Sequence, residues 1–297
     1  MGNRIRELEK AAGRTLDDLA KGLLKYQLVR GPAQRFANSR FASAFIRRTD
    51  RVRTRKLLAE VQAAPVPHHV GIIMDGNRRF AEVLGLGDVG LGHVAGQERL
   101  ENVLDWCLET NVRVLTVYAF STENFSRADP ERDLLMELFE RNFRKMAKDP
   151  RVHDNKIRVR AIGHLELLPD SVRESAEEVM EATRDYSEFS FNVAIAYGGR
   201  QEIVDAVRQI AREVRDQGLA AADITAATIQ ERLYTAELPD PDFIIRTSGE
   251  ERISNFLLWQ LAYAELYFAD VFWPQLDKRE FLLALREYQK RKRRYGN

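Results

Sequence analysis

The amino-acid sequence predicts an α/β fold: an open, mostly parallel central sheet flanked by helices, with a helical extension at the N-terminus. Three observations lead to this prediction. Val- and Ile-rich segments that are apolar over most of their length recur along the chain, as in strands covered on both faces of a parallel sheet. Longer segments with helical periodicity alternate with them, as in successive βαβ units. In residues 1–60, by contrast, leucines follow helical spacing and basic residues are frequent.

The predicted strands and helices alternate from residue 69 onward. The strands cover residues 69–74, 112–120, 156–163, 189–197 and 242–247. The helices lie near residues 93–109, 131–148, 169–185 and 199–217. Ligands of open α/β sheets bind beyond the carboxyl ends of the strands. We therefore expect the chemistry just after residues 74, 120, 197 and 247.

Charge and composition divide the chain into a basic helical extension, residues 1–64, and a main domain, residues 65–297. Residues 1–60 hold 15 Lys and Arg against 6 Asp and Glu, although the whole chain has a net charge of only +1. Such a segment favours an anionic surface, either membrane lipid or nucleic acid. Because no aromatic-interleaved basic platform accompanies it, peripheral membrane contact ranks above nucleic-acid binding. A solvated helix that packs on its own domain is an equal alternative to the membrane.

Other features of the sequence predict a cytoplasmic protein, with a peripheral place at the inner face of the membrane as one option. No uninterrupted apolar run approaches the ~20 residues that a spanning helix needs. The N-terminus is charged from Arg4 onward, unlike a secretory signal peptide. A single cysteine, Cys107, cannot form an internal disulfide, which fits a reducing compartment.

The first predicted strand is followed by Asp75-Gly76-Asn77-Arg78-Arg79-Phe80. Glycine and asparagine allow a tight turn whose backbone N–H groups converge on a phosphate, and the two arginines add charged donors. The ionised Asp75 would repel a phosphate unless a cation lay between them, so the motif suggests Mg²⁺ bridging to a diphosphate. An ordinary turn with solvated charges is the alternative for this motif alone.

Polar and aromatic residues are mixed after the second predicted strand, in Ser121-Thr122-Glu123-Asn124-Phe125-Ser126-Arg127. Small hydroxyls, an amide and an arginine interleaved with rings suit a ligand with one polar and one apolar end. A helix N-cap at Ser121 or Ser126 is the structural alternative, and both interpretations are compatible.

Two arginines stand at the end of the last predicted strand and just after it, in Arg246-Thr247-Ser248-Gly249-Glu250-Glu251-Arg252-Ile253-Ser254. Arg246, Arg252 and Ser254 are suited to a second anion site with the fork geometry of guanidinium groups. Glu265 then stands alone in an apolar stretch. Because an unpaired buried carboxylate is costly, Glu265 should be paired with one of the arginines or bound to a metal.

Residues 85–90 match the G-x-G-x-x-G pattern of dinucleotide-binding proteins. In such proteins the pattern lies directly at a strand-to-helix turn, and an acidic residue ends the next strand. Here the first glycine comes about ten residues after the predicted strand, and the next strand ends in Ala119-Phe120. A flexible loop is the better interpretation, and an NAD-dependent dehydrogenase is a poor second hypothesis.

Taken together, these motifs closely resemble the cis-prenyltransferase family, the undecaprenyl and dehydrodolichyl diphosphate synthases. Several strings match in fixed order over residues 69–296: HVGIIMDGNRRF, Gly92-His93, LTVYAFSTENFSR, NVAIAYGGR, IIRTSGEERISNFLLWQLAYAEL and RRYG. The paired arginines after DGN, the string DPRVHDNKIRVRAIG and the Glu after Gly249 resemble the archaeal branch most. That branch extends geranylgeranyl or farnesyl diphosphate with isopentenyl diphosphate.

The resemblance implies an Mg²⁺-dependent homodimeric transferase that makes a long, undecaprenyl-like cis-polyprenyl diphosphate for lipid glycan carriers. It implies catalytic roles for Asp75, which would hold Mg²⁺ together with Glu265, and for Asn124, which with Ser121 would assist proton removal. It implies substrate contacts for three groups of residues: the allylic diphosphate at Gly76, Asn77, Arg78, Arg79, Phe80 and His93; isopentenyl diphosphate at Arg246, Arg252, Ile253 and Ser254; and further contacts at Ser121, Thr122, Glu123, Phe125 and Arg127. Arg294-Tyr295-Gly296 matches an element that reaches across the family's dimer.

The chain departs from the family pattern at three places. No basic residue lies between Arg79 and His93, where the family usually has one to hold diphosphate, so primer affinity or choice should differ. Glu251 stands where bacterial members often have His, and Ser248 replaces a glycine. Two alternatives stay within the superfamily: an inactive partner subunit of a heteromeric synthase, and a short-chain synthase. Inactive partners tend to lose the Asp of the DGN turn, which is present here.

Overall fold

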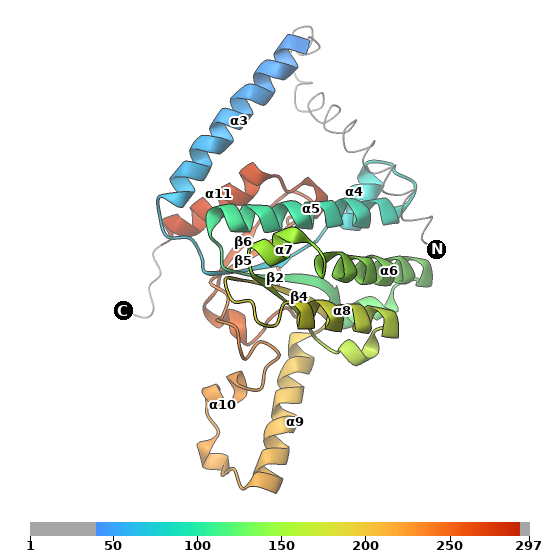
Figure 1. The fold of residues 1–297 in the computed structure, drawn as a ribbon, viewed down its shortest axis with the longest axis vertical. Helices are drawn as coiled ribbons and strands as arrows, with labels where there is room; N and C mark the ends of the chain where they lie inside the picture. Colours follow the sequence, from blue (N-terminus) through green and yellow to red (C-terminus); the bar gives the residue numbers. More distant parts are fainter. Residues whose placement is uncertain (1–39, 292–297) are drawn as a thin grey trace. The chain divides into compact units, whose positions relative to one another are not determined.

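The computed structural model describes residues 40–291 of the chain, and its side chains from residue 51. Its centre is a six-stranded parallel sheet with the strand order β3-β4-β2-β1-β5-β6 (Figure 1). The strands are β1 (His69–Ile73), β2 (Val114–Ser121), β3 (Ile157–Ile162), β4 (Phe189–Tyr197), β5 (Phe243–Arg246) and β6 (Glu265–Phe268). The open α/β architecture predicted from the sequence is therefore confirmed.

The chain divides into two compact units. Among the described residues, the helical unit comprises residues 40–66, 76–110 and 271–291, and the sheet unit comprises residues 67–75 and 111–270. All six strands belong to the sheet unit. The first half of the predicted N-terminal extension and the closing Arg294-Tyr295-Gly296 lie outside the described residues.

The helical unit contains α3 (Arg40–Gln62), α4 (Asn77–Val83), α5 (Val89–Thr110), the 3₁₀ turn η5 (Trp273–Gln275) and α11 (Lys278–Lys290). Helix α3 packs on α11, where Leu57 and Val61 are buried. The Gln289 side-chain amide donates to the Val61 carbonyl at 2.8 Å. The end of the basic extension is therefore part of the core of this unit.

Two glycines of α5 allow a close approach to the first turn of α4. A Cβ at Gly92 would lie 2.0 Å from the Asn77 carbonyl oxygen, and a Cβ at Gly96 would lie 2.4 Å from Asn77 Oδ1. Trp273 closes the same region by donating its indole N–H to the Gly96 carbonyl at 2.7 Å. Only glycine fits at these two positions, so α4 and α5 hold each other in place.

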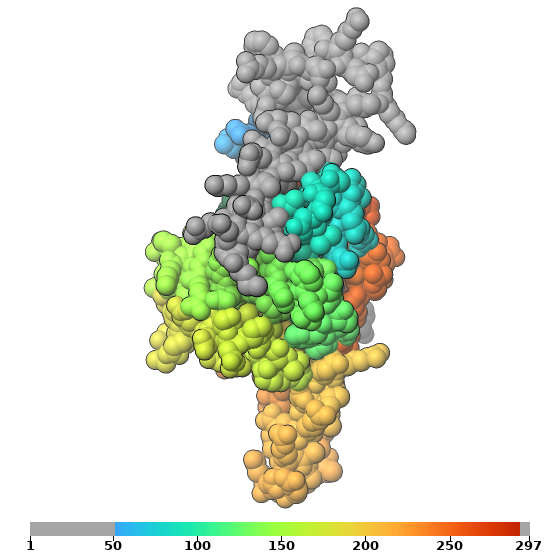
Figure 2. Space-filling view, turned by 90° about the vertical axis from the view of Figure 1, so that its right-hand side faces the viewer, coloured from blue at the N-terminus to red at the C-terminus, as the bar shows by residue number. Residues whose placement is uncertain are grey.

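In the sheet unit, helices α6 (Asp129–Met146) and α8 (Asp170–Ala182) pack on each other, and α8 also packs on β3 (Figure 1). The short helix α7 (Pro150–Asp154) lies beside β3 as well. Helix α9 (Gly199–Gln217) and the short α10 (Ala226–Gln230) contact each other and form a narrow lobe of this unit, coloured yellow to orange in Figure 2. The 3₁₀ turns are η1 (Thr122–Ser126), η2 (Leu165–Leu167), η3 (Ala221–Asp223) and η4 (Gln260–Tyr263).

All five predicted strands form, with ends that shift by no more than two residues. The predicted helices correspond to α5, α6, α8 and α9. Strand β6 and helices α4 and α11 were not predicted. The G-x-G-x-x-G pattern falls between α4 and α5, with its last glycine inside α5, so it does not occupy a strand-to-helix turn.

Strand β3 forms one edge of the sheet, and its backbone bonds to side chains of α8. The Val159 N–H donates to Thr183 Oγ1 at 3.0 Å, and the Ala161 N–H donates to Met180 Sδ at 3.3 Å. Thr183 is the residue at which α8 ends. Packing of α8 on β3 therefore includes direct capping of the edge strand.

None of the helices in the described part of the chain is both long and apolar enough to cross a membrane.

A buried histidine joins β1 to its neighbours in the sheet unit. The His69 side chain bonds through Nδ1 to the Pro239 carbonyl at 2.7 Å and through Nε2 to Thr116 Oγ1 at 2.8 Å. A carbonyl can only accept, so Nδ1 carries the proton and Nε2 accepts from the Thr116 hydroxyl. That hydroxyl in turn accepts from the Asn192 side-chain amide at 3.1 Å. This network requires a neutral imidazole.

We predict that His69 makes the fold less stable in mild acid. Burial lowers the pKa of His69 from 6.5 to about 4, against smaller opposing effects of the Pro239 carbonyl and Asp242. Below pH 6.5 the unfolded chain therefore binds a proton that the folded chain does not, and stability falls as the pH falls towards 4. The loss from this residue between pH 7 and pH 5 should be about 2 kcal/mol in the free energy of unfolding.

Urea denaturation at pH 7 and pH 5 measures this effect when the wild type is compared with His69→Gln, which cannot titrate. His68→Gln is the matched control, because His68 is adjacent and exposed. We expect the pH dependence to shrink in His69→Gln and to persist in His68→Gln. Equal pH dependence in all three proteins would contradict the prediction.

Candidate functional site

The strands after which the sequence predicted chemistry are neighbours in the sheet. In the order β4-β2-β1-β5, each of the four pairs in parallel with the next. Their carboxyl ends therefore meet at one edge of the sheet unit, where an open α/β sheet carries its ligand site.

An ion pair joins the ends of β1 and β5. Ile73 pairs with Arg246 in the sheet, and Asp75 follows two residues later. Arg246 Nη2 donates to Asp75 Oδ2 at 2.8 Å, and Nη1 donates to Ser254 Oγ at 2.8 Å and to the Arg252 carbonyl. Arg246 is only 3% exposed. A single buried guanidinium thus fixes three predicted site residues with respect to one another.

Thr247, which the sequence analysis assigned no role, fixes the backbone of Asp75. Its hydroxyl donates to the Asp75 carbonyl at 2.7 Å and accepts from the Asp75 N–H at 3.0 Å. Thr247 is completely buried. Its place as the last residue of a predicted strand was the only signal in the sequence, and a threonine there is also common as an ordinary strand residue.

Arg252 differs from Arg246 although the sequence grouped them. Its side chain is 60% exposed, and its guanidinium pairs with Glu250 at 2.5 Å. Ile253 beside it is half-buried, and Ser254 has a left-handed backbone with φ of 50°. Of the two arginines, Arg252 is the accessible cation, whereas Arg246 holds the loop together.

The segment after β2 is both a cap and a candidate site. Asn124 Oδ1 accepts from the Ser121 N–H at 3.1 Å, so the turn η1 begins at Ser121. Phe125 packs edge-on against Phe120 with their ring centroids 5.0 Å apart. Arg127 pairs with Glu131 at 2.9 Å. The N-cap that the sequence offered as an alternative at Ser121 is present, and Asn124 is one of its hydrogen-bonding groups.

Hydrogen bonds favour the ionised form of Glu123 in this segment. Burial raises its pKa, but hydrogen bonds to its carboxylate from its own N–H, Ser121, Asn255 and Thr122 outweigh that effect. The pKa of Glu123 therefore lies below its usual value. A fixed negative charge lies beside the hydroxyls of Ser121 and Thr122.

Asn255 connects three of the strand ends, and the sequence analysis missed it. Its Nδ2 donates to Glu123 Oε1 at 3.2 Å, after β2, and to Gln201 Oε1 at 3.3 Å, after β4. Its Oδ1 accepts from the Arg200 N–H at 2.9 Å, and its own carbonyl accepts from the Gly199 N–H at 2.7 Å. The backbone φ of 66° is left-handed, which asparagine tolerates better than most residues. None of these four contact partners lies near Asn255 in the sequence, so no local pattern revealed its role.

Glu202, near the start of α9, is a buried carboxylate that supports the same region. It accepts from the Tyr197 hydroxyl at 2.5 Å, from the Gln260 amide at 3.0 Å and from the Tyr234 N–H at 2.9 Å. Burial raises the pKa of Glu202, and the Gln260 and Tyr197 hydrogen bonds oppose that shift. The end of β4 is therefore attached to the η4 turn through a polar group inside the core.

The other predicted site residues lie in the helical unit, around the first turn of α4. Gly76 precedes the helix with φ of 104°, a conformation that favours glycine. The Phe80 N–H donates to the Gly76 carbonyl at 2.8 Å, and Phe80 is buried. Arg78 is exposed, and the Arg79 guanidinium lies 5.9 Å from the centre of the Phe272 ring. His93 is buried in α5, one residue after the close approach at Gly92.

Glu265 does not meet Asp75 within one chain. It begins β6 and pairs with Phe243, at the amino end of β5, whereas Asp75 lies beyond Arg246 at the carboxyl end. The two ends of β5 are about 10 Å apart at the usual rise of a strand. Across the described residues there is no group of three His, Cys, Asp or Glu side chains placed to hold a metal ion.

Comparison with known proteins identifies relatives over most of the chain. A family model described as undecaprenyl diphosphate synthase matches residues 73–296. A protein of Pyrococcus abyssi (strain GE5 / Orsay) named tritrans,polycis-undecaprenyl-diphosphate synthase (geranylgeranyl-diphosphate specific) is 53% identical, over 82% of this chain and 91% of its own. A protein of the same name from Methanopyrus kandleri is 52% identical over 82% of this chain and 89% of its own. The crystal structure of lavandulyl diphosphate synthase from Lavandula x intermedia in complex with dimethylallyl diphosphate matches with a TM-score of 0.74 at 33% identity, over 78% of this chain and 99% of its own.

We predict that Asn255→Ala destabilises the sheet unit by about 2 kcal/mol, because three side-chain hydrogen bonds are lost and alanine is strained at a left-handed φ. Chemical denaturation at pH 7 measures the change. Asn255→Gly keeps the backbone free to adopt that φ and should cost less, which separates the two causes.

Asn155→Ala serves as the matched control, since the Asn155 side chain makes one hydrogen bond among those described, to the Arg151 carbonyl at 2.8 Å, and the residue has an ordinary negative φ. An Asn255→Ala effect no larger than that of Asn155→Ala would show that the three strand ends do not depend on Asn255.

Proposed function

Because the chain belongs to the cis-prenyltransferase family, we propose that it condenses isopentenyl diphosphate onto geranylgeranyl diphosphate and makes an undecaprenyl-type cis-polyprenyl diphosphate. The chain is thus an enzyme that transfers prenyl groups. The observation that carries the finer proposal is the shared, geranylgeranyl-specific name of relatives that are about half identical over four-fifths of the chain. Farnesyl diphosphate, the other primer considered from the sequence, ranks second.

The reaction needs stabilisation of a leaving anion. The allylic C–O bond breaks, the diphosphate leaves with the bonding electrons, a new C–C bond forms to isopentenyl diphosphate, and one proton is lost from the adduct. Fixed N–H and guanidinium donors stabilise the departing diphosphate without reorganising during the step. We therefore assign the residues of the two units to the two diphosphates.

We assign the allylic diphosphate to the first turn of α4. The N–H groups that precede Phe80 have no acceptor within an α-helix, since intrahelical bonding begins four residues after the cap. The backbone of Gly76, Asn77 and Arg78 supplies such groups, and the exposed Arg78 guanidinium adds a charged donor. His93 and Phe80 are buried in the same unit and shape this turn.

We assign isopentenyl diphosphate to the loop after β5, with unequal roles for the two arginines. Arg252 is exposed and would exchange its Glu250 partner for the diphosphate. Arg246 is buried and would act by holding Ser254 and Asp75 in place. Ser254, which is exposed, would contribute its hydroxyl, and Ile253 its backbone.

We propose that Asp75 holds Mg²⁺. The Asp75 side chain is 27% exposed at the tip of β1, and its carboxylate is a hard oxygen ligand of the kind Mg²⁺ prefers. Mg²⁺ commonly uses one or two carboxylates together with substrate phosphates and water, so a single aspartate fits this chemistry. When bound, Mg²⁺ would neutralise charge on the leaving diphosphate. Glu265 lies at the other end of the strands and could contribute only from the second copy of a homodimer.

Two candidates take part in proton removal: Asn124 with Ser121 as helpers, and the departing diphosphate as acceptor. Asn124 Oδ1 accepts a hydrogen bond from the Ser121 N–H. Asn124 would therefore orient Ser121 and its hydroxyl rather than take a proton itself. The departing diphosphate is the other candidate, as it is released beside the new bond. Glu123, Thr122, Phe125 and Arg127 would shape this part of the site.

Product analysis by mass spectrometry tests the proposal. The full chain is incubated with Mg²⁺, isopentenyl diphosphate and one primer per reaction: dimethylallyl, geranyl, farnesyl or geranylgeranyl diphosphate. We expect a ladder of polyprenyl diphosphates, longest and most abundant with geranylgeranyl diphosphate, and no product in a matched reaction with a chelator.

Other outcomes favour other members of the superfamily. A product that stops after one or two additions would indicate a short-chain synthase. No condensation with any primer, from a protein whose fold is confirmed by circular dichroism, would indicate an inactive partner subunit. A ladder that persists with the chelator would contradict the role of Mg²⁺ only.

We further propose that the basic N-terminal segment brings the enzyme to anionic membranes. Its first residues lie outside the described part, but Arg51, Arg53 and Arg55 begin the described side chains of α3, and Arg51 and Arg53 are exposed. Since Leu57 and Val61 belong to the core of the helical unit, a deletion should end at residue 50. The full chain should sediment with anionic vesicles at low salt and dissociate at high salt, and the deletion variant should stay in the supernatant. Equal sedimentation of both proteins would rule out membrane contact through this segment.

A further inference from the structure

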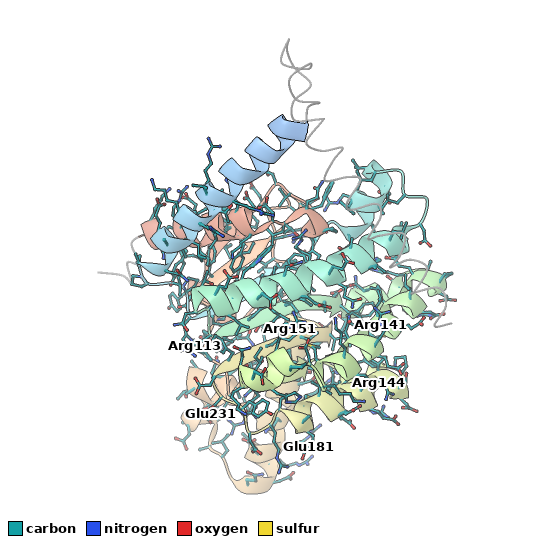
Figure 3. The ribbon with its side chains drawn as sticks, turned by 45° about the horizontal axis from the view of Figure 1, so that its top comes forward. Arg113, Arg141, Arg144, Arg151, Glu181 and Glu231 are labelled. Carbon is teal, nitrogen blue, oxygen red and sulfur yellow. The ribbon has the colours of Figure 1, made fainter. Side chains whose placement is uncertain are left out.

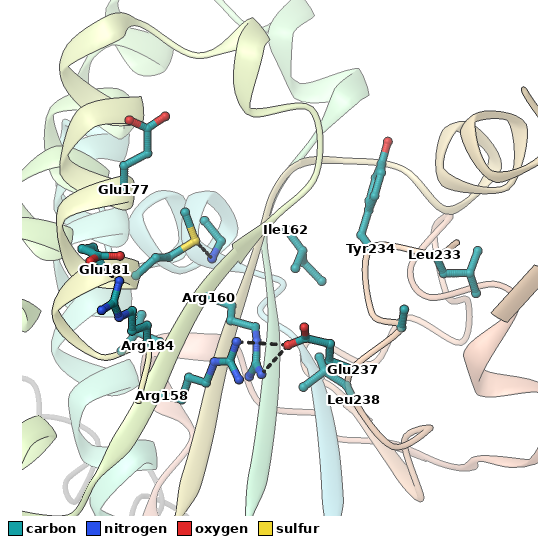
Figure 4. A pocket seen from close by; sticks show the side chains of 14 residues that line it. Arg158, Arg160, Ile162, Glu177, Glu181, Arg184, Leu233, Tyr234, Glu237 and Leu238 are labelled. Carbon is teal, nitrogen blue, oxygen red and sulfur yellow. Dashed lines mark hydrogen bonds and ion pairs between the residues drawn. The ribbon is translucent and has the colours of Figure 1, made fainter. Parts of the chain in front are cut away.

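A cavity of about 670 Å³ lies at the edge strand β3, between α8 and residues 233–238 (Figure 4). It is lined by arginines, glutamates and apolar side chains, all from the sheet unit. Its volume is in the range of small-ligand sites. We refer to it as the β3 cavity.

The arginine pair of the β3 cavity lies far from Asp75, although Ile162 at the carboxyl end of β3 also lines the cavity. Arg158 pairs with Ser190, which lies level with Val114 and His69, at the amino end of β1. Asp75 is six residues further along β1 and three strands away, which corresponds to roughly 20 Å or more at standard strand spacing. A ligand in the cavity would not contact the residues assigned to catalysis in the sheet unit.

Two guanidinium groups in this cavity share one carboxylate oxygen. Arg158 and Arg160 are two residues apart on β3 and therefore point to the same face. Both donate to Glu237 Oε2, at 3.0 Å and 3.2 Å, as the dashed lines in Figure 4 show. Three charged groups thus carry a net charge of +1 at one point of the wall.

The cations are held more firmly than the anion. The Arg160 side chain is 17% exposed and also donates to Ser190 Oγ at 2.7 Å, whereas the Glu237 side chain is 69% exposed. The pKa of Arg160 lies below its ordinary value because burial disfavours its charge and because Arg158 lies beside it; Glu237 offsets only part of this. An arginine pair with a single exposed counter-ion is suited to exchanging that carboxylate for an anion with more charge.

The rest of the cavity wall consists of apolar side chains and further charged ones. Ile162, Leu233 and Leu238 lie near the arginine pair, and Met180 of α8 lines the cavity. The Arg184–Glu181 ion pair of α8, 2.7 Å between charged atoms, balances its own charges at the rim. Glu177 of α8 also lines the cavity, so the charged side chains of the whole wall sum to zero. The excess of positive charge is local to Arg158 and Arg160, which share one carboxylate.

We propose that Arg158 and Arg160 form a second anion site, which binds a phosphate monoester with an apolar chain. The phosphate displaces the Glu237 carboxylate and takes donors from both guanidinium groups, and the chain lies against Ile162, Leu233 and Leu238. The shared chemistry is a phosphate head on an apolar body, whether the ligand is a free phosphorylated metabolite or a lipid with a phosphate headgroup.

Calorimetric titration of the full chain with n-octyl phosphate, and separately with inorganic phosphate, tests this proposal. Since Glu237 competes with the ligand, Glu237→Gln should tighten octyl phosphate binding by about three-fold, as expected from removing an exposed ion pair. Arg160→Gln should abolish this binding, and the more exposed Arg158→Gln should weaken it if Arg160→Gln fails to fold. Octyl phosphate should bind more tightly than inorganic phosphate.

The matched control is Glu188→Gln. The Glu188 side chain is 64% exposed and forms an ion pair with Arg113 at 3.5 Å. Figure 3 shows Arg113 apart from Glu181, which belongs to the cavity wall. The Glu188→Gln substitution makes the same change of charge outside the β3 cavity, so it should leave octyl phosphate binding unchanged. Equal effects of Glu237→Gln and Glu188→Gln, or binding that does not depend on either arginine, would overturn the proposal.

A second arm of the experiment measures binding of the full chain to vesicles that contain phosphatidic acid. At a salt concentration that prevents sedimentation through the basic N-terminal segment, vesicle binding that is lost in Arg160→Gln would assign the ligand to the membrane. Octyl phosphate binding without vesicle binding would assign the ligand to solution. Neither measurement uses prenyl transfer, so the outcome does not depend on the proposed function.

Discussion

The parallel register of β1 and β5 determines the arrangement of the site in the sheet unit. Because Ile73 pairs with Arg246, the carboxylate of Asp75 comes within 2.8 Å of a guanidinium that is almost fully buried. Removing one partner of a buried ion pair commonly costs about 3–5 kcal/mol, since the other charge is left without compensation. Asp75 therefore has a structural role as well as the proposed metal-binding role, and Thr247 and Ser254 are fixed through the same two residues. A loss of activity on changing Asp75 has two physical causes that only a parallel measurement of folding can separate.

Rigidity at the neighbouring strand ends comes from side chains rather than from regular structure. Asn255 and Glu202 each bond to groups that follow different strands, and Ser254, Asn255 and Leu257 all have left-handed backbones. Strained conformations of this kind persist only where surrounding contacts hold them. The loop that carries Arg252 is thus fixed on both sides, while the Arg252 side chain stays exposed. This combination suits a group that must meet a charged substrate without moving its backbone.

The sequence was sufficient to predict the sheet and the strand ends that lie side by side in it. Apolar Val- and Ile-rich runs identified five strands, and the rule for open α/β sheets selected four ends that are indeed neighbours. Strand β6 was not predicted because four half-exposed residues show no periodicity, and it forms through its pairing with β5. Helix α11 follows the last predicted strand and was likewise missed. The different environments of Arg246 and Arg252, the connections of Asn255 and the separation of Glu265 from Asp75 all depend on register between distant segments, which no local pattern encodes.

The contact between α8 and β3 has a consequence for the protein in a crowded solution. An edge strand with open backbone groups can recruit a strand from another molecule and so begin intermolecular sheet growth. Here the Val159 and Ala161 N–H groups already bond to Thr183 and Met180. Two side chains at one end of a helix thus act against self-association at this edge, and they do so in the same element that lines the β3 cavity.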